Sequence, residues 1–153
     1  MEQQAEENTI HHELAKSYLA YFVASMAGLL VDSFLHISFD VPYAKTVGII
    51  LMGMGPLLML WAQLTSAKGH AKPASRFVQY FEYGPYRFVR NPTHLGILLL
   101  VTGYTLISGS VVFFATTFIG FVVSNIFFGK YESLMHQSFG DAYTKVKETT
   151  PKV

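Results

Sequence analysis

The stretch PTHLGILLLVTGYTLISGSVVFFATTFIGFVVSNIFF, residues 92–128, decides the fold of this chain. It contains no Asp, Glu, Lys or Arg, and Gly109 divides it into two apolar runs, 92–108 and 110–128. A helix needs roughly 17 to 25 apolar residues to cross the hydrocarbon core of a bilayer. Both runs meet this requirement, the first only just. We therefore expect an antiparallel hairpin of two transmembrane helices joined by a tight turn.

Two further apolar runs lie on the N-terminal side of this hairpin, at 17–39 and 43–64, with a short turn between them. Helices of this length in a soluble protein would show a polar face, and these mostly do not. The sequence therefore predicts an all-α integral membrane bundle of four transmembrane helices. We expect the whole chain, residues 1–153, to be one membrane domain.

The composition excludes several other classes of protein. Charged residues make up 14% of the 153 residues, against roughly 25% in an ordinary soluble domain. Hydrophobic residues make up 51%, and the mean hydropathy is +0.33. These values argue against a soluble Rossmann enzyme, a nucleic-acid binder and a disordered regulator. The absence of cysteine excludes disulfides and thiolate chemistry.

The distribution of positive charge predicts the orientation of the helices in the membrane. Lys and Arg are enriched in cytoplasmic loops. With four crossings, ten of the eleven fall on one side and only Lys45 falls on the other. We expect both termini, the loop 65–91 and the tail 129–153 to be cytoplasmic, in a bacterial inner membrane or its equivalent. The tail alternates apolar and polar residues, which predicts a short amphipathic helix lying on the membrane surface.

The segment GPYRFVRNPTHLG, residues 84–96, carries the strongest chemical signal. Asn91 followed by Pro92 at the head of an apolar run predicts an N-cap and a first helical residue. Arg87 and Arg90 lie one turn apart beside this helix N-terminus. The unpaired N–H groups there favour an anion, so the segment could bind a carboxylate or phosphate. The alternative is a simple helix cap with arginines that contact lipid headgroups.

The hairpin brings a second set of polar residues to the same membrane face. Arg90 lies nineteen residues before Gly109, and Glu132 lies twenty-three after it. At about 1.5 Å per residue both emerge at the same end of adjacent helices. We expect a cytoplasmic pocket that contains Arg87, Arg90, Asn91, His94, Tyr131 and Glu132. The alternative for Glu132 is a solvated carboxylate at a helix end.

The order and spacing of these motifs resemble a known family. The pattern is Gly-Pro-Tyr-Arg-x-Val-Arg-Asn-Pro-x-x-x-Gly at 84–96, a helical hairpin, Glu132, Phe-Gly-x-x-Tyr at 139–143, and Pro151. It is similar to the isoprenylcysteine carboxyl methyltransferases, a grouping that includes phospholipid-methyltransferase-like membrane proteins. The resemblance covers residues 65–151. It implies a membrane enzyme that uses S-adenosylmethionine to methylate a membrane lipid or a lipid-like substrate.

The resemblance also implies roles for particular residues. Cofactor binding falls to a set that lies at the two ends of the hairpin: Tyr86, Arg87, Arg90, Asn91, His94, Glu132 and Tyr143. His94 is the candidate catalytic base if the acceptor is a thiol or a protonated amine. The chain departs from the family pattern at Asn91, where His is frequent, at His94, where Tyr is usual, and at Tyr131, where an acidic pair is reduced. These departures indicate a different substrate, or an activity that is reduced or lost.

Three functions remain open from the sequence. The first is a methyltransferase acting on a lipidic or small hydrophobic carboxylate, amine or thiol. The second is a non-catalytic membrane protein or accessory subunit that keeps the same scaffold. The third is a proton-coupled carrier that uses Asp32 and His36, which lie four residues apart on one helix face. The structural alternative for these two residues is a mutually satisfied pair near the outer end. The remaining histidines show no metal-ligand spacing, so we expect no metal.

Gly48, Gly53, Gly55 and Pro56 lie in the second apolar run. Small residues allow transmembrane helices to approach closely, and proline allows a kink. This helix could therefore open a lateral slot for a lipid, or it could simply pack against a neighbour.

The predicted topology can be tested with reporter fusions. Reporters placed at the N-terminus, within 65–91 and after the last residue should all be active on the cytoplasmic side, and a reporter near Lys45 should be active on the opposite side. A map that placed 65–91 outside the cytoplasm would contradict the predicted topology.

Overall fold

The computed structural model describes residues 2–69 and 84–150. These residues form four long helices: α1 (Glu2–Leu35), α2 (Ala44–Gly69), α4 (Pro92–Ser108) and α5 (Val111–Thr149). A short 3-10 helix, η2 (Gly84–Arg87), precedes α4. Within the described ranges the structure contains no β-strand beyond one isolated bridge. The prediction of an all-α protein is confirmed.

Three of the helices are long and apolar enough to cross a membrane. The candidate spans are His12–Leu35, Ala44–Ser66 and Val111–Leu134, and α4 is a shorter apolar helix of 17 residues. Large apolar side chains point outward from the spans; Phe34 is 84% exposed and Leu57 is 67% exposed. Exposed apolar side chains along whole helices suit contact with lipid tails and not with water.

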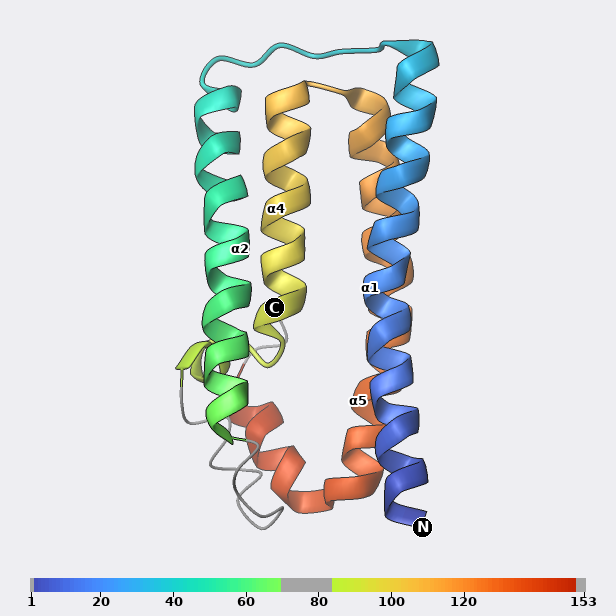
Figure 1. Ribbon diagram of the computed structural model, residues 1–153, viewed down its shortest axis with the longest axis vertical. Helices are drawn as coiled ribbons and strands as arrows, with labels where there is room; N and C mark the ends of the chain where they lie inside the picture. Colours follow the sequence, from blue (N-terminus) through green and yellow to red (C-terminus); the bar gives the residue numbers. More distant parts are fainter. Residues whose placement is uncertain (1, 70–83, 151–153) are drawn as a thin grey trace.

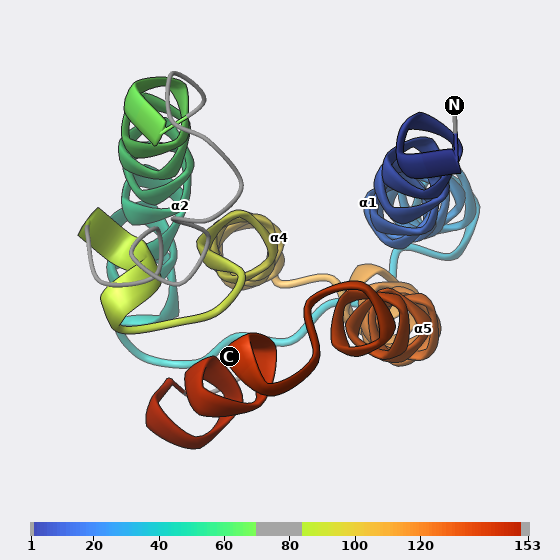
Figure 2. The same cartoon turned by 90° about the horizontal axis from the view of Figure 1, so that it is seen from below.

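The helices are arranged as two pairs (Figure 1). α2 packs along α4, and α1 packs along α5, whereas α4 and α5 contact each other little. Figure 2 shows the two pairs side by side when the molecule is seen from below. α4 and α5 are antiparallel and joined by a tight turn, as the sequence predicts, but each has its main partner elsewhere. Proximity in sequence therefore does not decide which helix faces pack together.

Glycines explain the pairing of α2 with α4. Gly48 faces Gly103, and Gly55 faces Gly96. A Cβ atom at Gly103 would lie 2.7 Å from the carbonyl oxygen of Gly48, and one at Gly55 would lie 2.5 Å from that of Gly96. The seven-residue spacing on each helix places both contacts on one face. The small residues therefore allow the two backbones to meet closely, as in other membrane helix pairs.

At the end of the bundle opposite the N-terminus, one hydrogen bond links α1 to α5 and another links the two connecting loops. The hydroxyl of Ser110 donates to Asp32 Oδ1 at 2.6 Å and accepts from the backbone N–H of Phe113 at 2.9 Å. The N–H of Phe39 donates to the carbonyl oxygen of Gly109 at 2.7 Å. Ser110 is therefore the N-cap of α5, and Asp32 holds it in place. This contact gives Asp32 a structural role.

Three helices extend further than the hydropathy pattern indicates, and α2 continues to Gly69 where the apolar run ends at 64. α1 covers Glu2–Leu35 where the apolar run suggested 17–39, and α5 continues past residue 128 to Thr149. The tail is broken at Gly140, whose φ of 51° and ψ of −128° lie outside the helical region. Hydropathy marks where a helix leaves lipid and not where its hydrogen bonding stops. The amphipathic character of the tail stays a prediction.

Replacing the packed glycines should destabilise the fold. We expect G96A and G103A each to lower the free energy of unfolding by about 1 to 3 kcal/mol, because the new methyl group forces the α2 and α4 backbones apart. G53A is the matched control, since a Cβ at Gly53 would meet nothing within 4 Å. Unfolding of the detergent-purified variants measures the effect. Equal stability of all three variants would contradict the close packing of α2 and α4.

Candidate functional site

The start of α4 is fixed by the side chain of Asn91. Its Oδ1 accepts a hydrogen bond from the backbone N–H of His94 at 3.1 Å, and Pro92 is the first helical residue. The predicted cap is therefore confirmed. The same Oδ1 accepts a second hydrogen bond from the hydroxyl of Tyr18 on α1 at 3.2 Å. The Asn91 amide is thus oriented by two helices at once.

His94 is the central contact between the two helix pairs. Its side chain is fully buried. Nε2 lies 3.3 Å from the Tyr21 hydroxyl on α1, and Nδ1 lies 3.4 Å from the Ser124 hydroxyl on α5. The imidazole also packs against the rings of Tyr21 and Phe128, with centroids 5.3 Å and 5.6 Å away. Both nitrogens of His94 are therefore engaged by neighbouring helices.

A buried ion pair lies one turn before this contact. The guanidinium of Arg90 pairs with the carboxylate of Glu132 on α5, and the two side chains are only 9% and 11% exposed. This pair joins the segment before α4 to the C-terminal end of the α5 candidate span. The structure therefore brings together Arg90, Asn91, His94 and Glu132, which lie 42 residues apart at the extremes.

Two buried donors in this cluster have no hydrogen-bond partner among the described residues. They are Nε of Arg90 and Nδ2 of Asn91. Buried polar atoms are usually paired, and an unpaired one costs about 1 to 3 kcal/mol. Two adjacent unpaired donors match a ligand that carries hydrogen-bond acceptors, such as a carboxylate or a nucleoside.

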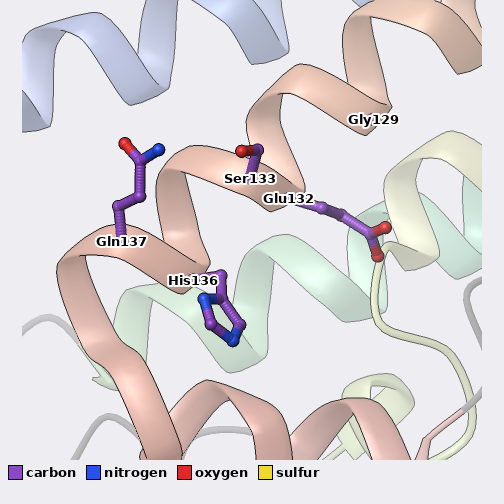
Figure 3. A pocket seen from close by; sticks show the side chains of 5 residues that line it. All are labelled: Gly129, Glu132, Ser133, His136 and Gln137. Carbon is purple, nitrogen blue, oxygen red and sulfur yellow. The ribbon is translucent and has the colours of Figure 1, made fainter.

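A pocket of about 330 Å³ opens beside the ion pair, near the C-terminal end of the α5 candidate span. Its lining is formed by Gly129, Glu132, Ser133, His136 and Gln137. Figure 3 shows Glu132 reaching from α5 toward the start of α4, and His136 projecting from the next turn of the same helix. The volume is at the lower end of the range for ligand pockets in proteins.

The other predicted residues are placed differently. Tyr86 is half-buried in η2, and Arg87 is exposed at the end of η2. Tyr131 packs its ring against Phe128 at 5.4 Å. The backbone of Tyr143 belongs to α5, but its side chain lies outside the described residues, as does most of the loop 65–91.

Sequence reasoning missed three residues of the cluster: Tyr18, Tyr21 and Ser124. All three lie inside apolar runs, where a hydroxyl resembles an ordinary helix residue. For the two tyrosines, the one available signal was their spacing along the helix. Tyr18 and Tyr21 are three apart, so they lie on one face of α1.

The cluster lies within a region that matches a known family. The sequence profile of the phospholipid methyltransferase family matches residues 43–142, well over half of the chain. No curated protein and no solved structure matches the chain. The matched region contains α4, the buried ion pair, the pocket and most of α5. The resemblance seen in the sequence is confirmed, and the chain belongs to the phospholipid methyltransferase family.

Proposed function

We propose that this protein is a membrane-embedded methyltransferase that uses S-adenosylmethionine to methylate a membrane lipid or a small hydrophobic acceptor. The family supports a membrane methyltransferase in general. The observation that carries the more specific proposal is the buried cluster of Arg90, Asn91 and Glu132. It combines both signs of charge at the start of α4 and on α5 with two buried donors that have no partner among the described residues.

The charges of this cluster suit a zwitterionic ligand. We assign Arg90, with its unpaired Nε and the α4 N-terminus, to the carboxylate of the methionine moiety. We assign Glu132 to the amino group or to a ribose hydroxyl. When bound, S-adenosylmethionine supplies a methyl group on a positively charged sulfur. Tyr86, Arg87 and Tyr143 are proposed to complete the walls of the cofactor site.

The remaining work of the protein is to position and desolvate the reactants. Arg90 and Glu132 are about nine-tenths buried, so charges held there interact in a largely water-free environment. Holding two reactants in the correct geometry lowers the barrier without any proton chemistry from the protein. The lipidic acceptor is proposed to enter from the bilayer, where the exposed apolar faces of the helices contact lipid.

We propose a topology of four crossings, in which α4 is the third along the chain and the shortest. Both termini and the loop 65–91 are then cytoplasmic. This topology puts the cofactor cluster on the cytoplasmic side, where the positive charges of the sequence are concentrated. α4 is supported along its length by the glycine contacts to α2, so its 17 residues need not span the bilayer alone.

A non-catalytic scaffold is the second candidate function. Its support is that Arg90 and Glu132 neutralise each other and that His94 is fully buried. A protein of this kind would keep the helices and the ion pair without binding the cofactor.

For His94 we propose a positioning role in place of the base role that the sequence suggested. Its full burial, and the engagement of both ring nitrogens by Tyr21 and Ser124, support this role. His94 would hold α1 and α5 against α4 so that Asn91 and Arg90 keep their places.

Binding of S-adenosylhomocysteine to the detergent-purified protein tests the cofactor site. We expect wild-type protein to bind, and R90Q to bind roughly 10- to 100-fold more weakly because a charged hydrogen bond is lost. K45Q is the matched control, since Lys45 lies in the first turn of α2, at the end of the bundle opposite Arg90. Calorimetric titration gives the dissociation constants.

The double variant R90Q/E132Q separates binding from folding. Either single substitution leaves one buried charge unpaired, which destabilises the fold. The double variant removes both charges, so we expect it to recover stability without recovering ligand binding. A wild-type protein that shows no binding at millimolar ligand would favour the non-catalytic scaffold.

Replacing His94 distinguishes its two possible roles. H94A should lower the free energy of unfolding by about 2 to 5 kcal/mol, because it leaves a cavity beside Phe128 and two hydroxyls without their partner. Chemical unfolding in detergent measures this loss. An H94A protein that is as stable as wild type but transfers no methyl group would restore the base role.

A further inference from the structure

We propose that Tyr18 on α1 is a positioning residue of the cofactor site, and that it directs the side-chain amide of Asn91 toward the carboxylate of the bound ligand. This inference rests on the proposed function. It concerns a helix that lies outside the region matched by the family, since that region begins at residue 43 and α1 ends at Leu35. The N-terminal helix is then part of the site as well as a membrane span.

Two tyrosine hydroxyls connect α1 to the start of α4. α1 packs mainly along α5 and contacts α4 little. The Tyr18 hydroxyl nevertheless donates to Asn91 Oδ1 at 3.2 Å. One turn further along α1, the Tyr21 hydroxyl lies 3.3 Å from His94 Nε2. The first residues of α4 are therefore oriented by α1 as well as by their own backbone.

The partners of the Asn91 amide determine its orientation. The backbone N–H of His94 donates to Oδ1 at 3.1 Å, and a backbone N–H can only donate. The amide oxygen, and not its nitrogen, must therefore face this group. Tyr18 donates to the same oxygen, which occupies both of its lone pairs. Nδ2 lies on the other side of the amide carbon and is directed away from both donors.

Nδ2 is the part of this amide that is left for a ligand. Asn91 is 7% exposed, and its Nδ2 has no hydrogen-bond partner among the described residues. The preceding residue, Arg90, carries a second buried donor, Nε, of the same kind. Two donors from consecutive residues at a helix N-terminus match the two oxygens of one carboxylate. We therefore assign Nδ2, together with Arg90 Nε, to the carboxylate of the methionine moiety.

Tyr18 affects this donor in two ways. Its hydrogen bond to Oδ1 limits rotation of the amide, so that Nδ2 keeps one direction. It also draws electron density toward the amide oxygen, which makes the Nδ2 protons better donors, because linked hydrogen bonds polarise one another in a buried environment. Tyr18 acts through Asn91 and does not need to contact the ligand.

Calorimetric titration with two ligands tests the role of Tyr18. S-adenosylhomocysteine carries the carboxylate, whereas methylthioadenosine carries the same nucleoside and thioether without the amino acid. We expect Y18F to bind S-adenosylhomocysteine about 2- to 10-fold more weakly than wild type, and methylthioadenosine within about twofold of wild type. Y104F is the matched control, since Tyr104 packs its ring on Phe113 near the opposite end of α4. It should bind both ligands like wild type.

A double-mutant cycle tests whether Tyr18 acts through Asn91. Serine is also a good N-cap but carries no amide donor, so N91S should keep the start of α4 and lose the donor. We expect N91S to weaken the binding of S-adenosylhomocysteine at least about 10-fold, because a hydrogen bond to a charged group is lost. In the N91S background, Y18F should weaken binding by less than a further factor of about two.

The ligand comparison separates positioning from support of the fold. Equal weakening of both ligands by Y18F would show that Tyr18 only stabilises the bundle, and would overturn the positioning role. Wild-type affinity of Y18F for S-adenosylhomocysteine, or effects of Y18F and N91S that multiply, would overturn it as well. If Y18F does not fold, N91S decides the matter, since wild-type affinity of N91S for S-adenosylhomocysteine excludes the Nδ2 contact. Failure of wild type to bind either ligand would instead contradict the proposed function itself.

Discussion

The ion pair between Arg90 and Glu132 connects two helix pairs that otherwise contact each other little along their length. α2 and α4 approach through glycines, and α1 and α5 form the second pair. In lipid, apolar faces gain little by meeting each other, so polar contacts and close packing must hold the pairs together. Arg90–Glu132 and the hydrogen bonds of His94 provide such contacts at one end. At the other end, the hydrogen bond from the Phe39 N–H to the carbonyl oxygen of Gly109 links the two connecting loops.

The same polar contacts create the chemical site. Because lipid solvates no charge, polar side chains in such a bundle gather where they satisfy one another. In this protein the polar side chains gather at the start of α4 and at the end of the α5 span. Arg90 Nε and Asn91 Nδ2 find no hydrogen-bond partner in the part of the chain that the structure describes. The proposed function assigns these leftover donors to a ligand, so the residues that stabilise the bundle and those that bind the cofactor are largely the same.

The sequence predicted much of the fold because lipid imposes a strict length on apolar helices. The run 92–108 matched α4 at both ends, since Asn91, Pro92 and Gly109 are strong boundary residues. The proximity of Arg90 to Glu132 followed from counting outward from Gly109. The pairing of α4 with α2 was not predicted, because it depends on which helix face carries Gly96 and Gly103. Tyr18, Tyr21 and Ser124 were missed because a hydroxyl in an apolar run has no local signal. The break at Gly140 depends on a single backbone conformation.

Hydrogen–deuterium exchange of the detergent-solubilised protein, with and without S-adenosylhomocysteine, tests the central claim most directly. If the start of α4 and the end of the α5 span form one cofactor site, the ligand should slow exchange in both 84–95 and 129–137, and leave the outer ends of α1 and α2 unchanged. Slower exchange in only one of these segments, or in neither, would show that the two helix ends do not bind the nucleoside together.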